Sequence, residues 1–340
     1  MLDLRTVAVV LDGPERLDVR ELRLNPPADD EVVVEIGISG VSTGTERLLW
    51  RGEMPSFPGM RYPLVPGYES VGRISHAGCQ SGRKVGQLVF VPGARCYKEA
   101  QGLFGGAAAR VVLEGQRTFV IDERFGEQGI LLALAATAHN ALRKPEGGYR
   151  CPELIVGHGV LGHLMARLAV SIGKVPPVVW EKDPRRITGR ENYPVIHPDE
   201  DTEGRYETIC DVTGDASLLD SLIGRLAAGG EIILAGFYQQ PLTFSFVPAF
   251  IRKARIRIAA EWEHQDLIKV YELALNDDLS LDGLITHRQP ATEALEAYRT
   301  AFSDSDCLKM ALEWMPATSS NNVGYRNDDP VALYASGRHH

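Results

Sequence analysis

The stretch that decides the fold reads Leu154-Ile155-Val156-Gly157-His158-Gly159-Val160-Leu161-Gly162. A short apolar run passes into Gly-x-Gly-x-x-Gly, and a helical pattern follows over residues 160–172. In such a unit Gly157 permits a tight turn, Gly159 lets a pyrophosphate approach the backbone, and Gly162 lets the helix pack on the sheet. Unpaired N–H groups at the helix start attract the phosphates. We therefore expect residues 157–162, His158, Val160 and Leu161 included, to bind a dinucleotide.

The residues after this unit extend the prediction. A second apolar strand over 178–180 ends at Glu181, and 181 − 157 places its carboxylate 24 residues after the first glycine. A ribose-binding acid is expected about 20 residues on. Thr213 and Gly236 follow later strands and are expected at the same crevice. The alternative is an ordinary βαβ unit whose glycines serve packing alone.

Composition limits the class of protein. The chain has 340 residues, 44% of them hydrophobic and 24% charged, as in soluble globular proteins. A net charge of −9 argues against a nucleic-acid partner. The five cysteines are scattered, which favours a reducing compartment, and no apolar run is long enough to span a membrane. We expect a cytoplasmic protein.

The pattern changes along the chain. Residues 1–122 contain short β-branched runs separated by turns, whereas strands and helices alternate over 123–265, which predicts a doubly wound parallel sheet. Residues 266–316 are expected to return to the first body. Residues 317–340 are polar without any hydrophobic period, and we expect a disordered tail. The predicted fold class is α/β.

Two regions carry a resemblance to a known family. Residues 40–46, Gly-Val-Ser-Thr-Gly-Thr-Glu, and residues 63–72, Pro-Leu-Val-Pro-Gly-Tyr-Glu-Ser-Val-Gly, resemble the front half of a medium-chain dehydrogenase/reductase. The resemblance implies a GroES-like β-rich catalytic domain followed by a Rossmann domain. Residues 42–50, with 57–60 and 65–70, are more narrowly similar to the branch that oxidises the 1-hydroxyethyl group of bacteriochlorophyllides with NAD. It also implies a homodimer.

One departure from the zinc-dependent relatives matters chemically. Where those enzymes carry cysteine and histidine, this chain has Ser42 and Tyr68, and only Glu69 matches their pattern. A hydroxyl and a phenol are poor substitutes for thiolate and imidazole as zinc ligands. We therefore expect no bound metal, and hydride transfer to NAD without zinc.

Without a metal, side chains must remove the hydroxyl proton of the alcohol. The candidates are loop residues at the former metal region, together with one histidine at the start of the alternating half: Ser42, Thr43, Thr45, Glu46, Tyr68, Glu69 and His139. A hydroxyl can bind the substrate oxygen and pass its proton toward a carboxylate or His139. Each has a structural alternative, because carboxylates anchor loops, threonines shape turns and a histidine can be a satisfied polar group.

A tetrapyrrole substrate requires a wide apolar site. Residues 47–62 are rich in large apolar and basic side chains, and the substrate-binding candidates are Arg47, Trp50, Phe57 and Arg61. Aromatic rings suit the macrocycle, and arginines suit its propionate. The alternative is a lid that packs on its own domain. Two other functions stay open: a zinc-free quinone or enone reductase using NAD(P)H, and a nucleotide-binding relic without catalysis.

Overall fold

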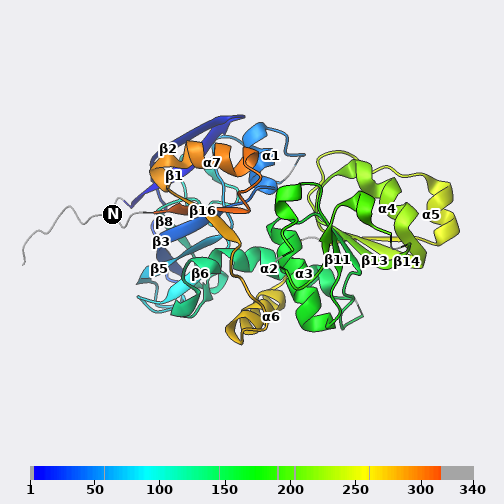
Figure 1. Cartoon of the computed structure of the whole chain (residues 1–340). Coiled ribbons are helices and arrows are strands. Elements are labelled where there is room, and N and C mark those ends of the chain that lie inside the picture. Colours follow the sequence, from blue (N-terminus) through cyan, green and yellow to red (C-terminus); the bar gives the residue numbers. More distant parts are fainter. Residues whose placement is uncertain are drawn as a thin grey trace, which may run out of the picture.

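The computed structural model describes residues 4–56, 58–144, 146–189, 191–202, 204–259 and 261–314. The chain forms two bodies that lie side by side, one rich in strands and one of alternating strands and helices (Figure 1). Helices α2 (Leu132–Leu142) and α6 (His264–Leu275) pack against each other between them. The predicted α/β fold class is confirmed.

The alternating body is built on one six-stranded sheet. Its strands are β10 (Leu154–Val156), β11 (Val178–Trp180), β12 (Val195–Ile196), β13 (Tyr206–Asp211), β14 (Leu226–Leu234) and β15 (Arg255–Ile258). The order is β12-β11-β10-β13-β14-β15, and every neighbouring pair is parallel. This is the doubly wound order 3-2-1-4-5-6, whose switch point lies between β10 and β13.

Strand alternation sends successive side chains to opposite faces of this sheet. Ile155 joins a core formed with α2, α3 (Val160–Gly173) and α6. Leu154 and Val156 instead join a core with α4 (Leu219–Arg225) and α5 (Phe246–Arg252). The continuous apolar run therefore follows from burial on both faces.

The strand-rich body holds two sheets around one core. A four-stranded sheet has the order β2-β1-β4-β7, and the larger sheet has the order β16-β17-β3-β5-β6-β9, with β8 paired to β3. Their strands are β1 (Arg5–Gly13), β2 (Arg16–Arg23), β3 (Glu31–Val41), β4 (Leu64–Val65), β5 (Ser70–Ala77), β6 (Leu88–Val91), β7 (Gln101–Gly102), β8 (Arg110–Glu114), β9 (Phe119–Val120), β16 (Ile285–Pro290) and β17 (Lys309–Glu313). Single 3-10 turns and one longer segment complete the described elements: η1 (Gly115–Arg117), η2 (Glu123–Leu131), η3 (Pro184–Arg186), η4 (Pro198–Glu200), η5 (Ala216–Leu218) and η6 (Ala291–Glu293).

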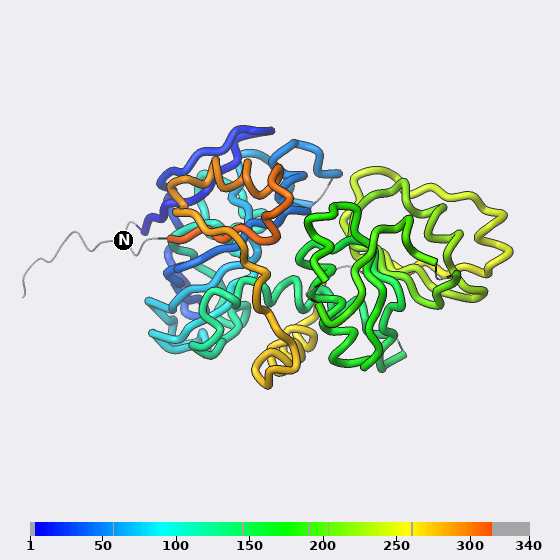
Figure 2. Tube along the Cα trace, viewed as in Figure 1, coloured from blue at the N-terminus to red at the C-terminus, as the bar shows by residue number. Residues whose placement is uncertain are grey.

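The C-terminal segment returns to this body. Strand β17 pairs antiparallel with β3, and α7 (Ala294–Ser303) packs on β2, so the latest and earliest described segments lie together (Figure 2). The exact boundaries 1–122, 123–265 and 266–316 stay a prediction. The expected tail over 317–340 lies outside the described residues.

Several elements differ from the sequence prediction, among them three of the longer ones. Residues 45–51 form helix α1 (Thr45–Arg51) instead of loop, and β2 and α5 were not predicted. Strand β2 alternates charged and apolar residues on a half-exposed face, which weakens its apolar pattern.

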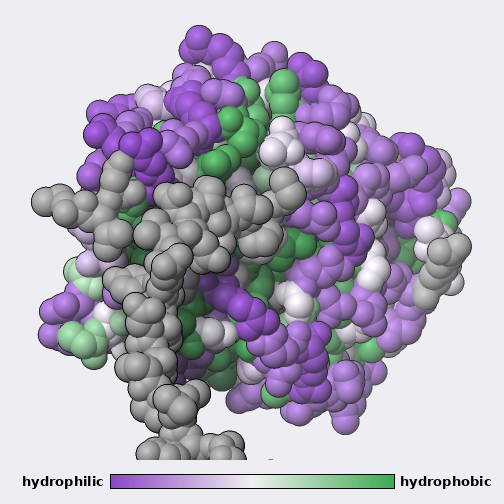
Figure 3. Space-filling model, turned by 90° about the vertical axis from the view of Figure 1, so that its left-hand side faces the viewer, coloured by the Kyte–Doolittle hydropathy of each residue, from purple (hydrophilic) through white to green (hydrophobic). Residues whose placement is uncertain are grey.

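In the described residues, no helix is both long and apolar enough to cross a bilayer. Figure 3 shows one end of the strand-rich body as mainly hydrophilic, with hydrophobic side chains in narrow areas between.

Candidate active site

The glycine turn has the geometry that a dinucleotide requires. Gly157 has φ 103°, a left-handed conformation that favours glycine. A Cβ on Gly162 would lie 2.1 Å from the carbonyl oxygen of Gly157, so the helix packs too closely for a side chain there. At Gly159, a Cβ would meet nothing within 4 Å. The backbone is therefore open to a ligand beside the first turn of α3, and this cradle fits a pyrophosphate.

The structure brings Thr213 to the same turn. A Cβ on Gly157 would lie 3.0 Å from Cγ2 of Thr213. The Thr213 backbone N–H and hydroxyl both donate to Oδ1 of Asp211, at 2.9 and 2.7 Å, and the hydroxyl of Tyr238 donates to Oδ2 at 2.8 Å. Asp211 is buried at the end of β13, and it holds this edge of the crevice in place. Gly236 lies beside it, with its backbone N–H donating to the Asp211 carbonyl.

Glu181 lies where the sequence predicts it. Its Oε2 accepts the His158 backbone N–H at 3.1 Å, and its Oε1 accepts those of Lys182 and Asp183 at 2.7 and 2.9 Å. The carboxylate is thus fixed at the end of β11, next to the glycine turn. Carboxylate oxygens have further lone pairs for ribose hydroxyl donors.

Ser42 and Tyr68 form a hydroxyl pair in the strand-rich body. Ser42 directly follows β3, Tyr68 lies between β4 and β5, and their oxygens are 2.7 Å apart. Ser42 is buried, whereas Tyr68 is partly exposed. Burial and the nearby Glu69 raise the pKa of Tyr68 well above its usual range, so the phenol is neutral. The pair can therefore bind one alcohol oxygen by hydrogen bonds.

Glu46 lies behind this pair on α1. Its Oε1 accepts the Ser42 backbone N–H at 3.1 Å, and its Oε2 accepts the hydroxyl of Tyr298 from α7. Burial raises the pKa of Glu46 to about 7, against the opposing effect of the Tyr298 hydrogen bond. Thr45 starts α1, and its side chain also bonds Tyr68. Thr43 is partly buried between these residues in sequence.

Glu69 is paired with a lysine from the other end of the chain. The Nζ of Lys309 on β17 lies 2.6 Å from Oε2 of Glu69, and it also donates to the Val41 carbonyl at 3.4 Å. Both side chains are fully buried. Burial raises the pKa of Glu69, and the attraction of Lys309 opposes this rise. Oε1 of Glu69 is buried without a hydrogen-bond partner.

His139 belongs to a different set of contacts. On α2, its Nδ1 lies 2.7 Å from Oδ1 of Asp266 on α6, and its Nε2 lies 3.0 Å from the Tyr149 hydroxyl. Burial lowers the pKa of His139. Asp266 also binds Arg143 and caps α6, so the geometry is that of a helix junction. A part in proton transfer stays a prediction.

The substrate-binding candidates differ in burial and in their place in the fold. Trp50 is 8% exposed and packs in the core, with its ring 6.3 Å from that of Tyr298. Arg47 is partly buried on α1, and Arg61 is exposed in the loop before β4. Phe57 lies outside the described residues. Contact of any of them with a substrate stays a prediction.

The fit to zinc is poor at this site. Over the described ranges, no three side chains of histidine, cysteine, aspartate or glutamate come together as a metal site would need. Ser42 and Tyr68 offer neutral oxygens, and Glu69 is already bound to Lys309.

Sequence reasoning missed Tyr298, Lys309 and Asp211. A lysine within the apolar run Lys309-Met310-Ala311-Leu312 is the one usable indication, because a charge in a buried strand requires a partner. Tyr298 carries no such mark, since a tyrosine on an amphipathic helix is ordinary.

Comparison with known proteins agrees with the fold. The family "Alcohol dehydrogenase GroES-like domain" matches residues 28–123. An alcohol dehydrogenase of Escherichia coli CFT073 complexed with NADH has a TM-score of 0.78 at 18% identity, covering 91% of this chain and 99% of its own. A dehydrogenase of Sinorhizobium meliloti bound to NADP has a TM-score of 0.75 at 16% identity, with 91% and 99% covered.

Two curated relatives are far more similar in sequence. The 2-desacetyl-2-hydroxyethyl bacteriochlorophyllide A dehydrogenase of Cereibacter sphaeroides is 51% identical over 316 residues, covering 92% of this chain and 99% of its own length. The protein of the same name from Rhodobacter capsulatus is 50% identical, with 92% and 100% covered. With this identity along nearly the whole chain, and with the two-body fold of alcohol dehydrogenases, the protein belongs to the 2-desacetyl-2-hydroxyethyl bacteriochlorophyllide A dehydrogenase family.

Proposed function

We propose that this protein oxidises the 3-(1-hydroxyethyl) group of a bacteriochlorophyllide to a 3-acetyl group, a step of bacteriochlorophyll biosynthesis. The observation that carries the proposal is the Ser42–Tyr68 hydroxyl pair, 2.7 Å between oxygens, where zinc-dependent relatives place metal ligands. The identity to the two curated relatives supports the substrate class.

The reaction removes a hydride from the carbinol carbon and a proton from its oxygen. A bound nicotinamide supplies the hydride acceptor. The hydroxyls of Ser42 and Tyr68 hold the alcohol oxygen, and the hydroxyl that receives its proton passes its own proton on toward a carboxylate, for which Glu46 lies behind the pair. The conjugated macrocycle spreads the positive charge that builds on the carbinol carbon, which lowers the need for a metal.

The cofactor in this proposal is NAD. The Glu181 carboxylate at the end of β11 favours a free 2′-hydroxyl and repels a 2′-phosphate. The neighbouring arginines are engaged elsewhere: Arg185 pairs with Asp183 at 2.9 Å, and Nε of Arg186 donates to the Ser305 carbonyl at 2.8 Å. Both guanidinium groups are therefore bound to other residues and not directed to a 2′-phosphate.

Zinc independence is part of the proposal. It is supported by the neutral oxygens of Ser42 and Tyr68 and by the Glu69–Lys309 pair. Elemental analysis of active protein tests it. Stoichiometric zinc, with activity lost to a chelator and restored by zinc, would overturn it.

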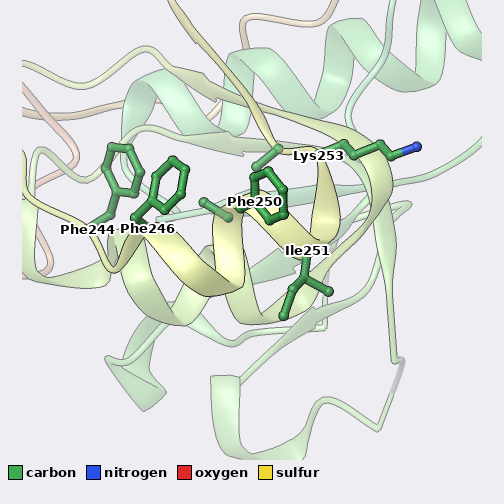
Figure 4. Close-up of a pocket in the computed structure, with 7 residues that line it drawn as sticks. Phe244, Phe246, Phe250, Ile251 and Lys253 are labelled. Carbon is green, nitrogen blue, oxygen red and sulfur yellow. The ribbon is translucent and has the colours of Figure 1, made fainter.

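We further propose a homodimer formed through the edge of the alternating body. Strand β15 ends the sheet, and α5 beside it exposes Phe246, Phe250 and Ile251, each about 70% accessible. Phe244 and Phe246 lie together at the start of the helix, while Ile251 points away on its other side (Figure 4). A second copy covers both the unpaired strand edge and this apolar face.

We also propose a cytoplasmic location, supported by scattered cysteines that form no disulfide among the described residues.

An absorption assay tests the reaction. Purified protein with NAD and the 3-hydroxyethyl bacteriochlorophyllide should give NADH and the red-shifted spectrum of the acetyl product. Turnover of quinones or enones with NADPH instead would indicate the reductase alternative. Cofactor binding without turnover of any tetrapyrrole would indicate a relic.

A further inference from the structure

The ring of His158 lies between the glycine turn and the loop that follows β11. It is 2% exposed, with Nδ1 3.3 Å from the Arg186 carbonyl and Nε2 3.1 Å from the Tyr193 hydroxyl. A carbonyl oxygen only accepts, so Nδ1 carries the proton and Tyr193 donates to Nε2. Because the His158 backbone also donates to Glu181, one residue joins the turn to the loop at three points.

A second ring supports this one. His163 on α3 stacks on His158, with centroids 3.5 Å apart and planes at 13°, and its Nδ1 donates to the Gly159 carbonyl at 2.9 Å. Burial lowers the pKa of both histidines to about 4, so two neutral rings stack without charge repulsion. Glu191 faces the pair and is bound by Arg167 at 3.2 Å. The rings therefore form a rigid block under the turn.

We propose that His158 is a positioning residue that fixes the loop over 181–187 against the glycine turn and thereby sets the preference for a dinucleotide with a free 2′-hydroxyl. The inference rests on the proposed NAD specificity. The ring binds the Arg186 carbonyl, and it thereby holds against the turn the loop that carries Glu181, whose carboxylate also accepts the His158 backbone N–H. Without the ring, the loop can shift, and the Arg186 guanidinium can leave the Ser305 carbonyl to meet a 2′-phosphate.

Fluorescence titration with NADH and NADPH tests the proposal by binding alone. For His158→Ala we expect the Kd for NADH to rise about tenfold, as loss of one hydrogen bond and its packing allows, and the NADPH-to-NADH ratio of Kd values to fall. His158→Asn keeps a donor toward the Arg186 carbonyl and should restore most of the ratio. His287→Ala, on β16, is the matched control and should change neither Kd.

Failure of the positioning role can be distinguished from failure of the proposed NAD specificity. Equal weakening of NADH and NADPH, or an unchanged ratio in folded His158→Ala, overturns the positioning role. A preference of the unmodified protein for NADPH instead overturns the proposed NAD specificity. If the alanine variant does not fold, Tyr193→Phe takes its place: loss of one bond to the ring should lower the ratio by about twofold to threefold, and no change would overturn the inference.

Discussion

Lys309 and Glu69, 240 residues apart in sequence, are bound at 2.6 Å inside the strand-rich body. Glu46, in contrast, meets a tyrosine hydroxyl and a backbone N–H as its hydrogen-bond partners. Two buried carboxylates thus lie near the Ser42–Tyr68 pair, one with an adjacent cation and one held by neutral donors. This difference gives them different charge behaviour, and it underlies two of the predictions below.

Removal of Lys309 should leave an unpaired buried charge. We expect Lys309→Met to lose about 3–5 kcal/mol of unfolding free energy, because the carboxylate of Glu69 keeps its desolvation cost without its partner. The double variant Lys309→Met/Glu69→Gln should recover most of that loss. Urea denaturation measures both. Additive losses in the double variant would show that the pair is not coupled.

Glu46 should make stability depend on pH. Its folded pKa of about 7 is above its ordinary value of 4.5, so the folded state holds the extra proton between these values. The contribution is fully present below pH 4.5 and is lost as pH rises through 7, a loss of about 3 kcal/mol. Glu46→Gln lacks this titration. The stability of the unmodified protein relative to Glu46→Gln should therefore fall between pH 5 and pH 8, and a difference that stays constant over this range would contradict the prediction.

Tyr68 should matter for chemistry more than for cofactor binding. Tyr68→Phe removes the phenol that holds the alcohol oxygen, and we expect kcat/KM to fall by about a hundredfold or more. Ser42→Ala should cause a smaller fall, because the phenol remains. The Kd for NADH should stay unchanged in both. Tyr271→Phe is the control. Tyr271 lies on α6, and its hydroxyl accepts the Asp122 backbone N–H at 3.1 Å. Full activity of Tyr68→Phe would exclude the hydroxyl pair.

The α5 face should determine the oligomeric state. We expect the unmodified protein to have twice the mass of the chain in light scattering, and Phe250→Asp to shift it toward the monomer, because a charge opposes burial of the face. Val85→Asp places a charge at a position in the other body that is 65% exposed, and it should leave the mass unchanged. A monomer for the unmodified protein would contradict the proposed dimer.

The extent of correct prediction follows from how local each feature is. The strand, turn and helix of 154–173 are adjacent in sequence, so spacing alone predicts the fold of this unit. Helix α1 stands where loop was expected, because burial of Leu48, Leu49 and Trp50 stabilises it. The contacts of Glu69 with Lys309 and of Glu46 with Tyr298 depend on the return of the chain, and a single sequence carries no record of such distant pairs.

The return of β17 to the edge of β3 also sets an order of events during synthesis. The six-stranded sheet is complete once Ile258 has left the ribosome, whereas β3 gains this neighbour only after residue 313. Until then the nascent strand-rich body presents an open strand edge, and Glu69 lacks its partner Lys309. The half that holds the nucleotide turn can therefore fold while the half that holds the alcohol site is still incomplete, and chains cut short before Lys309 are expected to retain the first and lose the second.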